Sequence, residues 1–426
     1  MKKLNVLVFP CGSENAGEIY QALRYSVHVN QLVGASGVSD HGEFRFENYR
    51  GDLPLIDDES FDDAFLALLE ECQTDIVFAT HDSVAVKLAL LAQRQGFYLV
   101  NGNATTAQIT RYKSETYALF QDCRWVPACY HPEYPVAEWP VLIKPDCGQG
   151  GKDVQRVDDA AQLLQAIKNV PQPLVVEFLP GEEITVDCFT DRKRQLIWAG
   201  PRSRERVRAG ISMRSQKQNP DDEIMDIITT INSRLVFRGP WFVQLKKDKY
   251  GKWKLLEISC RIAGTMVFQR ARGINLPLMT LHDFLERSIT PLASEHITLV
   301  DRSVKTVSRI DIPVEHVFID LDDTLIINGY AVPAVMALLY QCKAQGKSLH
   351  LITRHISDPV DTLRQSAIAE SLFDQVIHLT ESTDKKSFYI PEKSLFIDNY
   401  FIERQDVAKL KNVAVMDVDA VEFLLR

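Results

Sequence analysis

Short apolar runs and segments of helical period alternate along the first 105 residues. Residues 4–9 (LNVLVF) and 75–80 (DIVFAT) predict buried β-strands, and residues 16–23 repeat apolar side chains with helical spacing. Ser60 stands at the expected N-cap of a helix that runs to about residue 72. Asp82 is expected to cap the next helix, an interpretation favoured over a role in a site. The alternation predicts a parallel sheet, a Rossmann-like layer over residues 1–105.

Residues 106–312 show a different pattern, in which helices mix with strands of antiparallel type. Strands are predicted at 174–178 and 184–191, and residues 239–261 predict a hairpin whose turn lies at 248–252. Apolar and polar side chains alternate again from about residue 297 until Pro313 interrupts them. We therefore expect an α+β domain that ends near residue 312.

A new strand–helix pattern begins after that boundary. Strands are expected at 317–321, 348–353 and 394–398, with helices at 332–345 and 358–371 and a last helix that ends at Arg426. This pattern predicts a second, smaller Rossmann-like domain over residues 313–426. The overall expectation is an α/β chain of three domains, 1–105, 106–312 and 313–426.

Composition narrows the class of protein. The 426 residues are 46% hydrophobic and carry a net charge of −9, which argues against nucleic acids and anionic membranes as partners. No apolar run approaches the length of about 18 residues that spans a bilayer. The eight cysteines lack CxxC spacing, so we expect reduced thiols, no zinc site and a cytoplasmic protein.

The stretch Val141–Asp153 (VLIKPDCGQGGKD) carries the first candidate chemistry. Lys144 ends an apolar strand, and the loop that follows contains Gly148, Gly150 and Gly151. Glycines allow backbone N–H groups to approach a polyanion, and a lysine beside them supplies a positive charge. A tight turn without a ligand is the alternative for such a loop. The stretch is consistent with a phosphate-binding loop.

Four spaced motifs extend this interpretation: TRYKSETYALF, VLIKPDCGQGG, VVEFLPGEEITVD and VQLKKDKYGKWKLLEISCR. In this order they resemble the ATP-grasp superfamily, in particular its carbamoyl-phosphate-synthetase-like, carboxylate–amine ligase branch. The resemblance implies a pre-ATP-grasp layer, an ATP-grasp domain, and ATP with Mg²⁺ (or Mn²⁺) as cofactors. The implied nucleotide-binding residues are Lys113, Lys144, the loop glycines Gly148, Gly150 and Gly151, the adenine-side residues Glu177, Phe178 and Leu179, and the ribose-side Glu183. The implied metal ligands are Gln244 and Glu257, and Arg261 is implied to face the transferred phosphoryl group.

One position departs from the family pattern. Ser259 stands where the family usually has an asparagine metal ligand. Its hydroxyl can still bind a metal, and a lost or weakened second metal is the alternative. The third motif is implied to be the hinge segment of the family. The basic segment 201–220 lies between this hinge and the two strands that carry Gln244 and Glu257. We interpret it as a clamp for an anionic substrate through Arg202 and Arg208, and a solvated basic loop is the alternative. The resemblance implies that a carboxylate is activated by ATP and then attacked by an amine or another nucleophile.

The third domain carries a separate motif, VFIDLDDTLI at 317–326, which resembles the first motif of the haloacid-dehalogenase phosphotransferases. The resemblance implies Asp320 as nucleophile and Asp322 as general acid and base. Thr353 would bind phosphoryl oxygens, Lys386 (or Lys385) would neutralise charge, and Asp398 would bind Mg²⁺ together with Asp320 and Asp322. Only a short segment separates the first two motifs, so no sizeable cap is expected.

Two positions leave alternatives open in this domain. Many relatives have a second acid where Asn399 stands, and Asp406 is a weaker replacement. The resemblances together predict a bifunctional ligase and phosphatase that acts on small carboxylates, nucleophiles and a phosphorylated metabolite. A regulatory protein that only senses such ligands and an ATP-dependent kinase are the alternatives. The sequence leaves the substrates and homodimer formation open.

Overall fold

The computed structural model describes residues 2–131, 136–148 and 150–426, and its contacts divide the chain into two compact units. Unit 1 comprises residues 1–303 and unit 2 comprises residues 304–426. The sequence placed the last boundary after residue 312. The segment before that residue packs with unit 2, since the backbone N–H of Ser308 donates to the carbonyl of Phe423 at 2.8 Å. No helix of the described residues is both apolar and long enough to span a bilayer.

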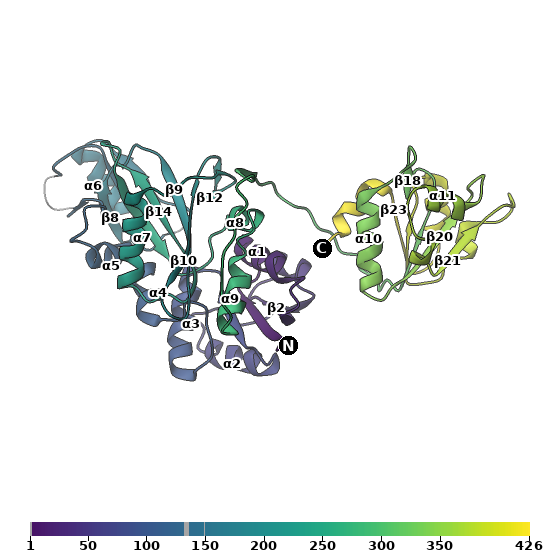
Figure 1. Ribbon diagram of the computed structural model, residues 1–426, viewed down its shortest axis with the longest axis horizontal. Helices are drawn as coiled ribbons and strands as arrows, with labels where there is room; N and C mark the ends of the chain where they lie inside the picture. The colour runs from purple at the N-terminus through teal and green to yellow at the C-terminus, as the bar shows by residue number, and fades with distance from the viewer. Residues whose placement is uncertain (1, 132–135, 149) are drawn as a thin grey trace. The chain divides into compact units, whose positions relative to one another are not determined.

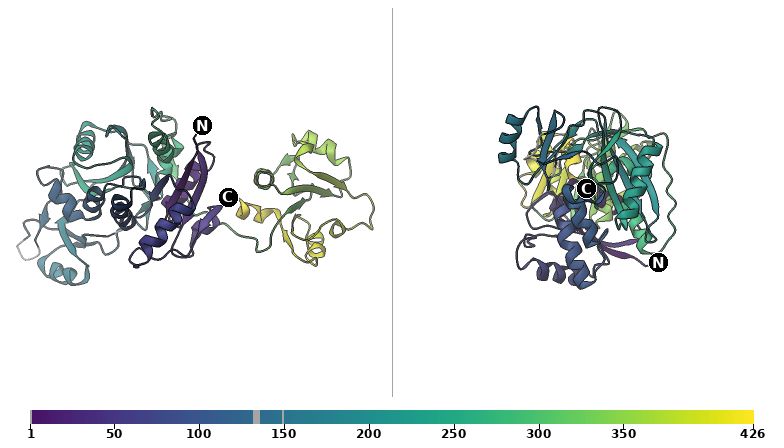
Figure 2. Two further views of the ribbon diagram at one scale, coloured as in Figure 1. Left: turned by 90° about the horizontal axis from the view of Figure 1, so that it is seen from below. Right: turned by 90° about the vertical axis from the view of Figure 1, so that its left-hand side faces the viewer.

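Unit 1 begins with a four-stranded parallel sheet in the order β3-β2-β1-β4, as the strand–helix alternation predicts. These strands and their helices, drawn in purple and blue, lie together in Figures 1 and 2. The sheet contains β1 (Leu4–Phe9), β2 (Val29–Ala35), β3 (Asn48–Arg50) and β4 (Ile76–Ala79); its helices are α1 (Glu14–Leu23), α2 (Phe61–Glu71) and α3 (Asp82–Gln95). The apolar strands and the apolar helix faces bury each other. This packing holds the ends of β1 and β4 in place.

Two antiparallel sheets follow in unit 1. The first has the order β5-β8-β6-β7 and the second the order β10-β9-β14-β15. They contain β5 (Cys129–Tyr130), β6 (Val141–Pro145), β7 (Gln155–Val157), β8 (Pro173–Glu177), β9 (Glu183–Thr190), β10 (Leu196–Ser203), β14 (Gly239–Lys247) and β15 (Trp253–Ser259). The predicted hairpin over 239–261 is present as β14 and β15, which pair Gln244 with Glu257.

Shorter elements complete unit 1. These are α4 (Ala104–Arg111), α5 (Lys113–Leu119), α6 (Ala160–Asn169), α7 (Asp222–Arg234), α8 (Val267–Ala271), α9 (Leu276–Phe284), β11 (Val207–Arg208), β12 (Ile211–Ser212), β13 (Arg214–Gln216), β16 (Leu299–Asp301) and the 3₁₀ helix η1 (His41–Phe44). The alternation seen after residue 297 forms only the three-residue strand β16, which pairs with β13.

Unit 2 is built on a five-stranded parallel sheet in the order β21-β20-β17-β22-β23. Its strands are β17 (His316–Ile319), β20 (Ser348–Thr353), β21 (Gln375–His378), β22 (Ser394–Ile397) and β23 (Val413–Met416), with the hairpin strands β18 (Ile326–Ile327) and β19 (Tyr330–Ala331). Its helices are α10 (Pro333–Ala344), α11 (Pro359–Gln365), α12 (Phe401–Val407) and the 3₁₀ helices η2 (Glu370–Leu372), η3 (Lys386–Phe388) and η4 (Val418–Leu424).

Several local expectations are wrong. The helix expected over 358–371 ends at Gln365, because Ala367 adopts a positive φ of 57° that breaks it. The chain ends in η4 after the unpredicted strand β23, not in one long helix. In contrast, Ser60 does stand at the N-cap of α2 as expected, although its side chain makes no capping hydrogen bond. Asp82 lies within α3, whose N-cap is His81.

Candidate functional sites

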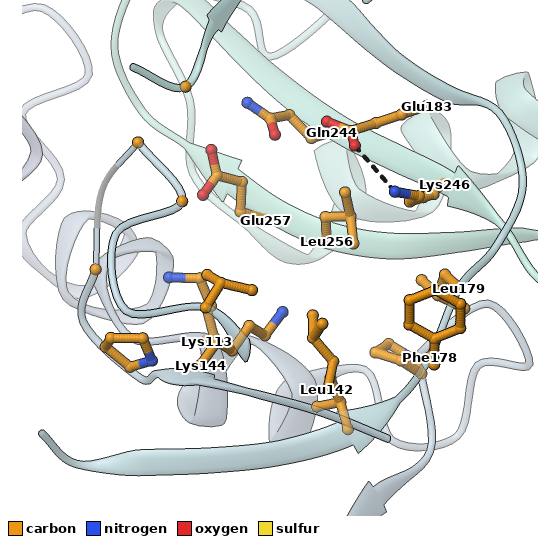
Figure 3. Close-up of a pocket in the computed structure, with 18 of the residues that line it drawn as sticks. Lys113, Leu142, Lys144, Phe178, Leu179, Glu183, Gln244, Lys246, Leu256 and Glu257 are labelled. Atoms are coloured by element: carbon orange, nitrogen blue, oxygen red, sulfur yellow. Dashed lines mark hydrogen bonds and ion pairs between the residues drawn. The ribbon is translucent and has the colours of Figure 1, made fainter. Parts of the chain in front are cut away.

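A cavity of about 440 Å³ lies between the two antiparallel sheets of unit 1. One wall comes from β6 and β8, and the other from β9, β14 and β15. Figure 3 shows Lys113 and Lys144 on one side of this cavity, and Glu183, Gln244 and Glu257 on the other. The hairpin register places the last two residues as direct cross-strand neighbours, so their side chains reach the cavity together. We call this cavity the inter-sheet cavity.

The lysine wall has an excess of positive charge. Lys144 is buried, and its Nζ donates to the Tyr117 hydroxyl at 2.9 Å. Burial, and then the positive charge of Lys113, lowers the pKa of Lys144 to about 8, although Glu257 opposes this shift. The Nζ of Lys113, the first residue of α5, donates to the Asp146 carbonyl at 3.2 Å. Among the residues that the structure describes, neither lysine forms an ion pair with a carboxylate, so this wall of the cavity favours an anion.

The opposite wall supplies oxygen atoms. The Glu183 carboxylate forms an ion pair with Arg204 at 2.7 Å and another with Lys246 at 3.4 Å. Within the described residues no three His, Cys, Asp or Glu side chains gather as a metal site. Magnesium takes few protein ligands and fills its remaining positions with phosphate oxygens and water. One carboxylate and one amide oxygen, from Glu257 and Gln244, therefore fit a magnesium ion that accompanies a nucleotide.

The hinge residues line the same cavity at its far end. Phe178 and Leu179 contribute apolar surface, and the Arg156 guanidinium stacks over the Phe178 ring at 4.9 Å. Glu177 also lines the cavity, but its Oε1 accepts the Ala128 N–H at 3.0 Å. This apolar end suits a planar ring, while the charged end suits phosphates.

The three loop glycines line the cavity beside the lysines. Gly150 and Gly151 have φ values of 64° and 71°, which side chains with a Cβ rarely adopt. A Cβ on Gly150 would approach the Ala209 carbonyl oxygen to 2.9 Å. The loop therefore packs closely against the turn at residues 209–210.

A second cavity of about 540 Å³ adjoins the first and shares Gly148, Gln244 and Glu257 with it. We call it the acceptor cavity. Arg202 and Arg261 line it, together with residues from the amino-terminal ends of α1 and α3. Arg208 does not line either cavity among the described residues, so the structure separates the two arginines that the sequence grouped as a clamp.

Arg202 is engaged inside the protein. Its Nε donates to Asp187 at 2.8 Å, and its side chain is 1% exposed. One of its terminal nitrogens, Nη1, has no partner. Arg202 therefore keeps one free donor beside the acceptor cavity, but most of its charge is neutralised by Asp187.

Asp82 connects the parallel sheet to the metal-side strand. Its carboxylate accepts the Ser259 hydroxyl at 2.6 Å and the Arg261 guanidinium at 2.7 Å. Burial raises its pKa, but Arg261 and Ser259 outweigh that effect and lower it to about 2. The capping role expected for Asp82 is wrong because this carboxylate is turned toward β15. The Ser259 hydroxyl is thus engaged in a hydrogen bond to Asp82. The same carboxylate fixes the position of the Arg261 guanidinium.

Unit 2 holds a separate group of charged residues at the carboxyl edge of its sheet. Lys386 Nζ donates to Asp320 at 2.6 Å and to Asp398 at 2.7 Å, and all three side chains are buried. Burial raises the pKa of Asp320 to about 6, with Lys386 opposing the shift and Asp398 adding to it. Lys385 lies at the surface, 3.9 Å from Asp406. The geometry therefore selects Lys386 over Lys385.

The remaining predicted residues of unit 2 surround this group. Thr353 is fully buried at the end of β20, and its hydroxyl accepts the His355 N–H at 3.1 Å. The Asn399 N–H donates to the Thr324 hydroxyl at 3.0 Å. Asp406 accepts a hydrogen bond from Ser387 at 2.6 Å, which makes it part of the contact between η3 and α12.

His355 was missed by the sequence analysis. Its Nδ1 lies 2.9 Å from both carboxylate oxygens of Asp322, and its Nε2 lies 2.7 Å from the Thr362 hydroxyl. The only available signal was its position two residues after Thr353. These contacts fix the orientation of the Asp322 carboxylate.

Comparison with known proteins agrees with this architecture. Residues 169–306 match the family model described as ATP-grasp in the biosynthetic pathway with Ter operon. An L-amino acid ligase from Bacillus licheniformis is similar with a TM-score of 0.54 at 19% identity, over 67% of this chain and 75% of the ligase. N5-carboxyaminoimidazole synthetase from Staphylococcus aureus, complexed with ADP, gives a TM-score of 0.57 at 13% identity, over 68% and 80%.

A third solved structure is the biotin carboxylase domain dimer of 2-oxoglutarate carboxylase from Hydrogenobacter thermophilus, in complex with MgADP, ADP and bicarbonate. Its TM-score is 0.56 at 12% identity, over 70% of this chain and 73% of that one. Comparison with curated proteins gives no match. The similar structures show the ATP-grasp fold over about two thirds of the chain, and the ATP-grasp family model matches residues 169–306.

Proposed function

We propose that unit 1 is an ATP-dependent ligase that activates a carboxylate for attack by an amine or another nucleophile. The observation that carries this proposal is the inter-sheet cavity, where Lys113 and Lys144 face Gln244 and Glu257. The similar solved structures include an L-amino acid ligase and an ADP complex of a synthetase, which supports the nucleotide and the reaction class.

In this proposal each wall of the cavity has its own task. Lys144 and Lys113 bind phosphate oxygens, Phe178 and Leu179 contact the base, and Glu183 accepts hydrogen bonds from the ribose. Arg261, held by Asp82, faces the transferred phosphoryl group and stabilises the charge that develops on it. Magnesium, held by Gln244 and Glu257, would neutralise phosphate charge. The acceptor cavity receives the carboxylate, and Arg202, which lines it, contributes positive charge that Asp187 partly offsets.

Release of ADP that depends on an added carboxylate tests the ligase. Wild-type protein with ATP, Mg²⁺ and a panel of carboxylates is expected to form a hydroxamate in the presence of hydroxylamine, which traps an activated acyl group. Lys144→Met is expected to reduce this formation by about 10²–10³-fold, the range for loss of one charged group that stabilises a transition state. Hydroxamate formation that Lys144→Met leaves unchanged would reject the assignment.

We also propose that unit 2 is a magnesium-dependent phosphomonoesterase. Asp320 would attack phosphorus while Asp322 gives its proton to the leaving alcohol. Water would then attack the aspartyl-phosphate, return a proton to Asp322 and release inorganic phosphate. The support is the buried arrangement of Asp320, Lys386 and Asp398, together with the contact between Asp322 and His355.

Hydrolysis of p-nitrophenyl phosphate tests the phosphatase. Asp320→Asn keeps the shape of the side chain but removes the nucleophile, so hydrolysis is expected to fall to background while ADP formation by unit 1 continues. An Asp320→Asn protein that retains full hydrolysis would exclude the role of this residue.

A regulatory protein that binds ATP without turnover is the second candidate. The hydrogen bond from Ser259 to Asp82 favours it, because this side chain is turned away from metal ligation. Tight nucleotide binding without ADP release under any carboxylate would favour this alternative. In either case we expect a cytoplasmic protein whose partners are small molecules. A homodimer is one assembly to test, since the similar biotin carboxylase domain forms a dimer.

A further inference from the structure

Large apolar side chains stand exposed directly after the proposed catalytic residues of unit 2. Phe388 follows Lys386 by two residues and is 72% exposed, and Phe401 follows Asp398 by three residues and is 62% exposed. Ile356, three residues after Thr353, is fully exposed. We call this group the apolar rim, and it comprises Ile356, Phe388, Tyr389, Tyr400, Phe401 and Ile402.

The segments that carry the rim are tied to one another. Ser387 donates to Asp406 at 2.6 Å, which joins η3 to α12. Arg354 pairs with Glu403 of α12 at 2.9 Å and donates to the Glu381 carbonyl at 3.3 Å. Because β17, β20 and β22 are adjacent and parallel, their carboxyl ends share one edge of the sheet. The segments that carry the rim are therefore anchored beside the acidic group, because Lys386 contacts Asp320 at 2.6 Å and the Tyr400 N–H donates to Asp398 at 2.7 Å.

Single exposed apolar residues are ordinary, but a group beside a candidate site calls for a ligand. Four of the six rim side chains are aromatic, which favours contact with a planar ring. Taken together, the segments 354–358, 381–388 and 398–406 carry six acidic and four basic residues. This charge disfavours an anionic membrane surface as the ligand.

We propose that the apolar rim binds the alcohol part of the phosphatase substrate, and that this alcohol carries an aromatic ring. The inference rests on the proposed phosphatase function. The buried group at Lys386 takes the phosphate, and the rim takes the ring, so that a site without a sizeable cap gains affinity and selectivity from its edge. Small polar phosphate esters lack the part that the rim contacts.

The test compares 2-naphthyl phosphate with ethyl phosphate on the full chain in the presence of Mg²⁺. Phe401→Ser and Phe388→Ser are each expected to lower kcat/KM for the naphthyl ester at least fivefold, and to change it less than twofold for the ethyl ester. Tyr340→Ser is the matched control, because Tyr340 is 58% exposed in unit 2 but lies on α10. It is expected to change neither value. The ratio of kcat/KM for the two esters is compared between each variant and the wild type, because the difference in leaving-group reactivity is the same in both proteins.

Binding to the Asp320→Asn protein separates the two proposals. Calorimetry is expected to show naphthyl phosphate binding that each rim variant weakens about fivefold, whether or not the wild type hydrolyses it. Hydrolysis that requires Asp320 but an unchanged ester ratio in both rim variants would overturn the rim and leave the phosphatase intact. The rim proposal would also be overturned if the Asp320→Asn protein did not bind naphthyl phosphate, or bound both esters equally. A lower Tm in both rim variants than in Tyr340→Ser would likewise overturn it.

Discussion

Each unit buries a lysine at its candidate site, but the two lysines have opposite surroundings. Lys144 of unit 1 contacts a tyrosine hydroxyl, and burial, followed by the charge of a second lysine, lowers its pKa to about 8. Lys386 of unit 2 lies between two carboxylates at 2.6 and 2.7 Å. The first lysine lacks an anion and is suited to bind one, whereas the second neutralises acids that are already present.

This difference indicates how each site treats phosphate. The inter-sheet cavity attracts a polyanion with uncompensated charge, as expected for a nucleotide site. The site in unit 2 keeps a carboxylate buried beside a lysine, as expected for a nucleophile that must stay reactive but not repel an incoming phosphate. A buried lysine therefore indicates function only when its partners are known.

The largest expected effect is on stability. Lys386→Met leaves two buried carboxylates unpaired and is expected to destabilise unit 2 by about 3–5 kcal/mol. Lys144→Met removes a buried charge whose described hydrogen bond is to a hydroxyl and not to a carboxylate, so it is expected to be neutral or to stabilise unit 1 by about 1 kcal/mol. Calorimetry of the full chain, with the transition of each unit assigned from the variants, measures both. Equal losses from the two changes would contradict the comparison.

The next effect concerns Asp82, which holds Arg261 from a different part of the chain. Asp82→Asn is expected to lower the rate of ADP formation by about 10–100-fold, because small displacements of a reacting group have effects of that size. Nucleotide affinity is expected to stay within about twofold, since Asp82 does not line the inter-sheet cavity. Rate and ADP affinity are measured on the same protein.

Ser259→Ala is the matched control for this change. It removes the other hydrogen bond of Asp82 but keeps the pairing with Arg261, so a loss below about fivefold is expected. A larger loss from Ser259→Ala than from Asp82→Asn would show that Ser259, and not the position of Arg261, carries the effect.

The role of Asp82 shows where prediction from sequence ends. The hairpin of β14 and β15 could be predicted because local alternation and turn residues determine it. The residues of the group at Lys386 were named from the resemblance of their motifs to a known family, and strand order accounts only for Asp320 and Asp398, which follow the adjacent parallel strands β17 and β22. The contact between Asp82 and Arg261 joins residues 179 positions apart. A local pattern offers only a capping role for such a residue.

Short elements could not be predicted from the sequence for a related reason. The strand β23 has four residues, and an apolar run of that length does not distinguish a strand from part of a helix. Its pairing with β22 decides the matter. Arg202 was predicted from its type and segment, but its pairing with Asp187 depends on the register of β9 and β10. Both outcomes depend on tertiary contacts.

The pH dependence of the phosphatase distinguishes the sites further. Asp320 must be ionised to attack phosphorus, and its pKa is raised to about 6 in the free protein. The kcat/KM for p-nitrophenyl phosphate is therefore expected to rise about tenfold per pH unit on the acid side of the Asp320 pKa. Bound Mg²⁺ favours the ionised carboxylate, so this rise is expected at lower pH in saturating Mg²⁺ than in low Mg²⁺. A profile whose acid side does not move with the Mg²⁺ concentration would show that Asp320 does not bind the metal.

The smallest expected effect tests the loop that covers the inter-sheet cavity. Gly150→Ala and Gly151→Ala both place a Cβ on a residue of positive φ, at a matched backbone cost of about 1 kcal/mol. Only the first adds a close approach to the Ala209 carbonyl oxygen, because the space around Gly151 is open. Gly150→Ala is expected to raise the KM for ATP about 3–10-fold, and Gly151→Ala less than about threefold. Equal changes would show that contact with the 209–210 turn has no part in nucleotide binding, and that the loop acts through its backbone alone.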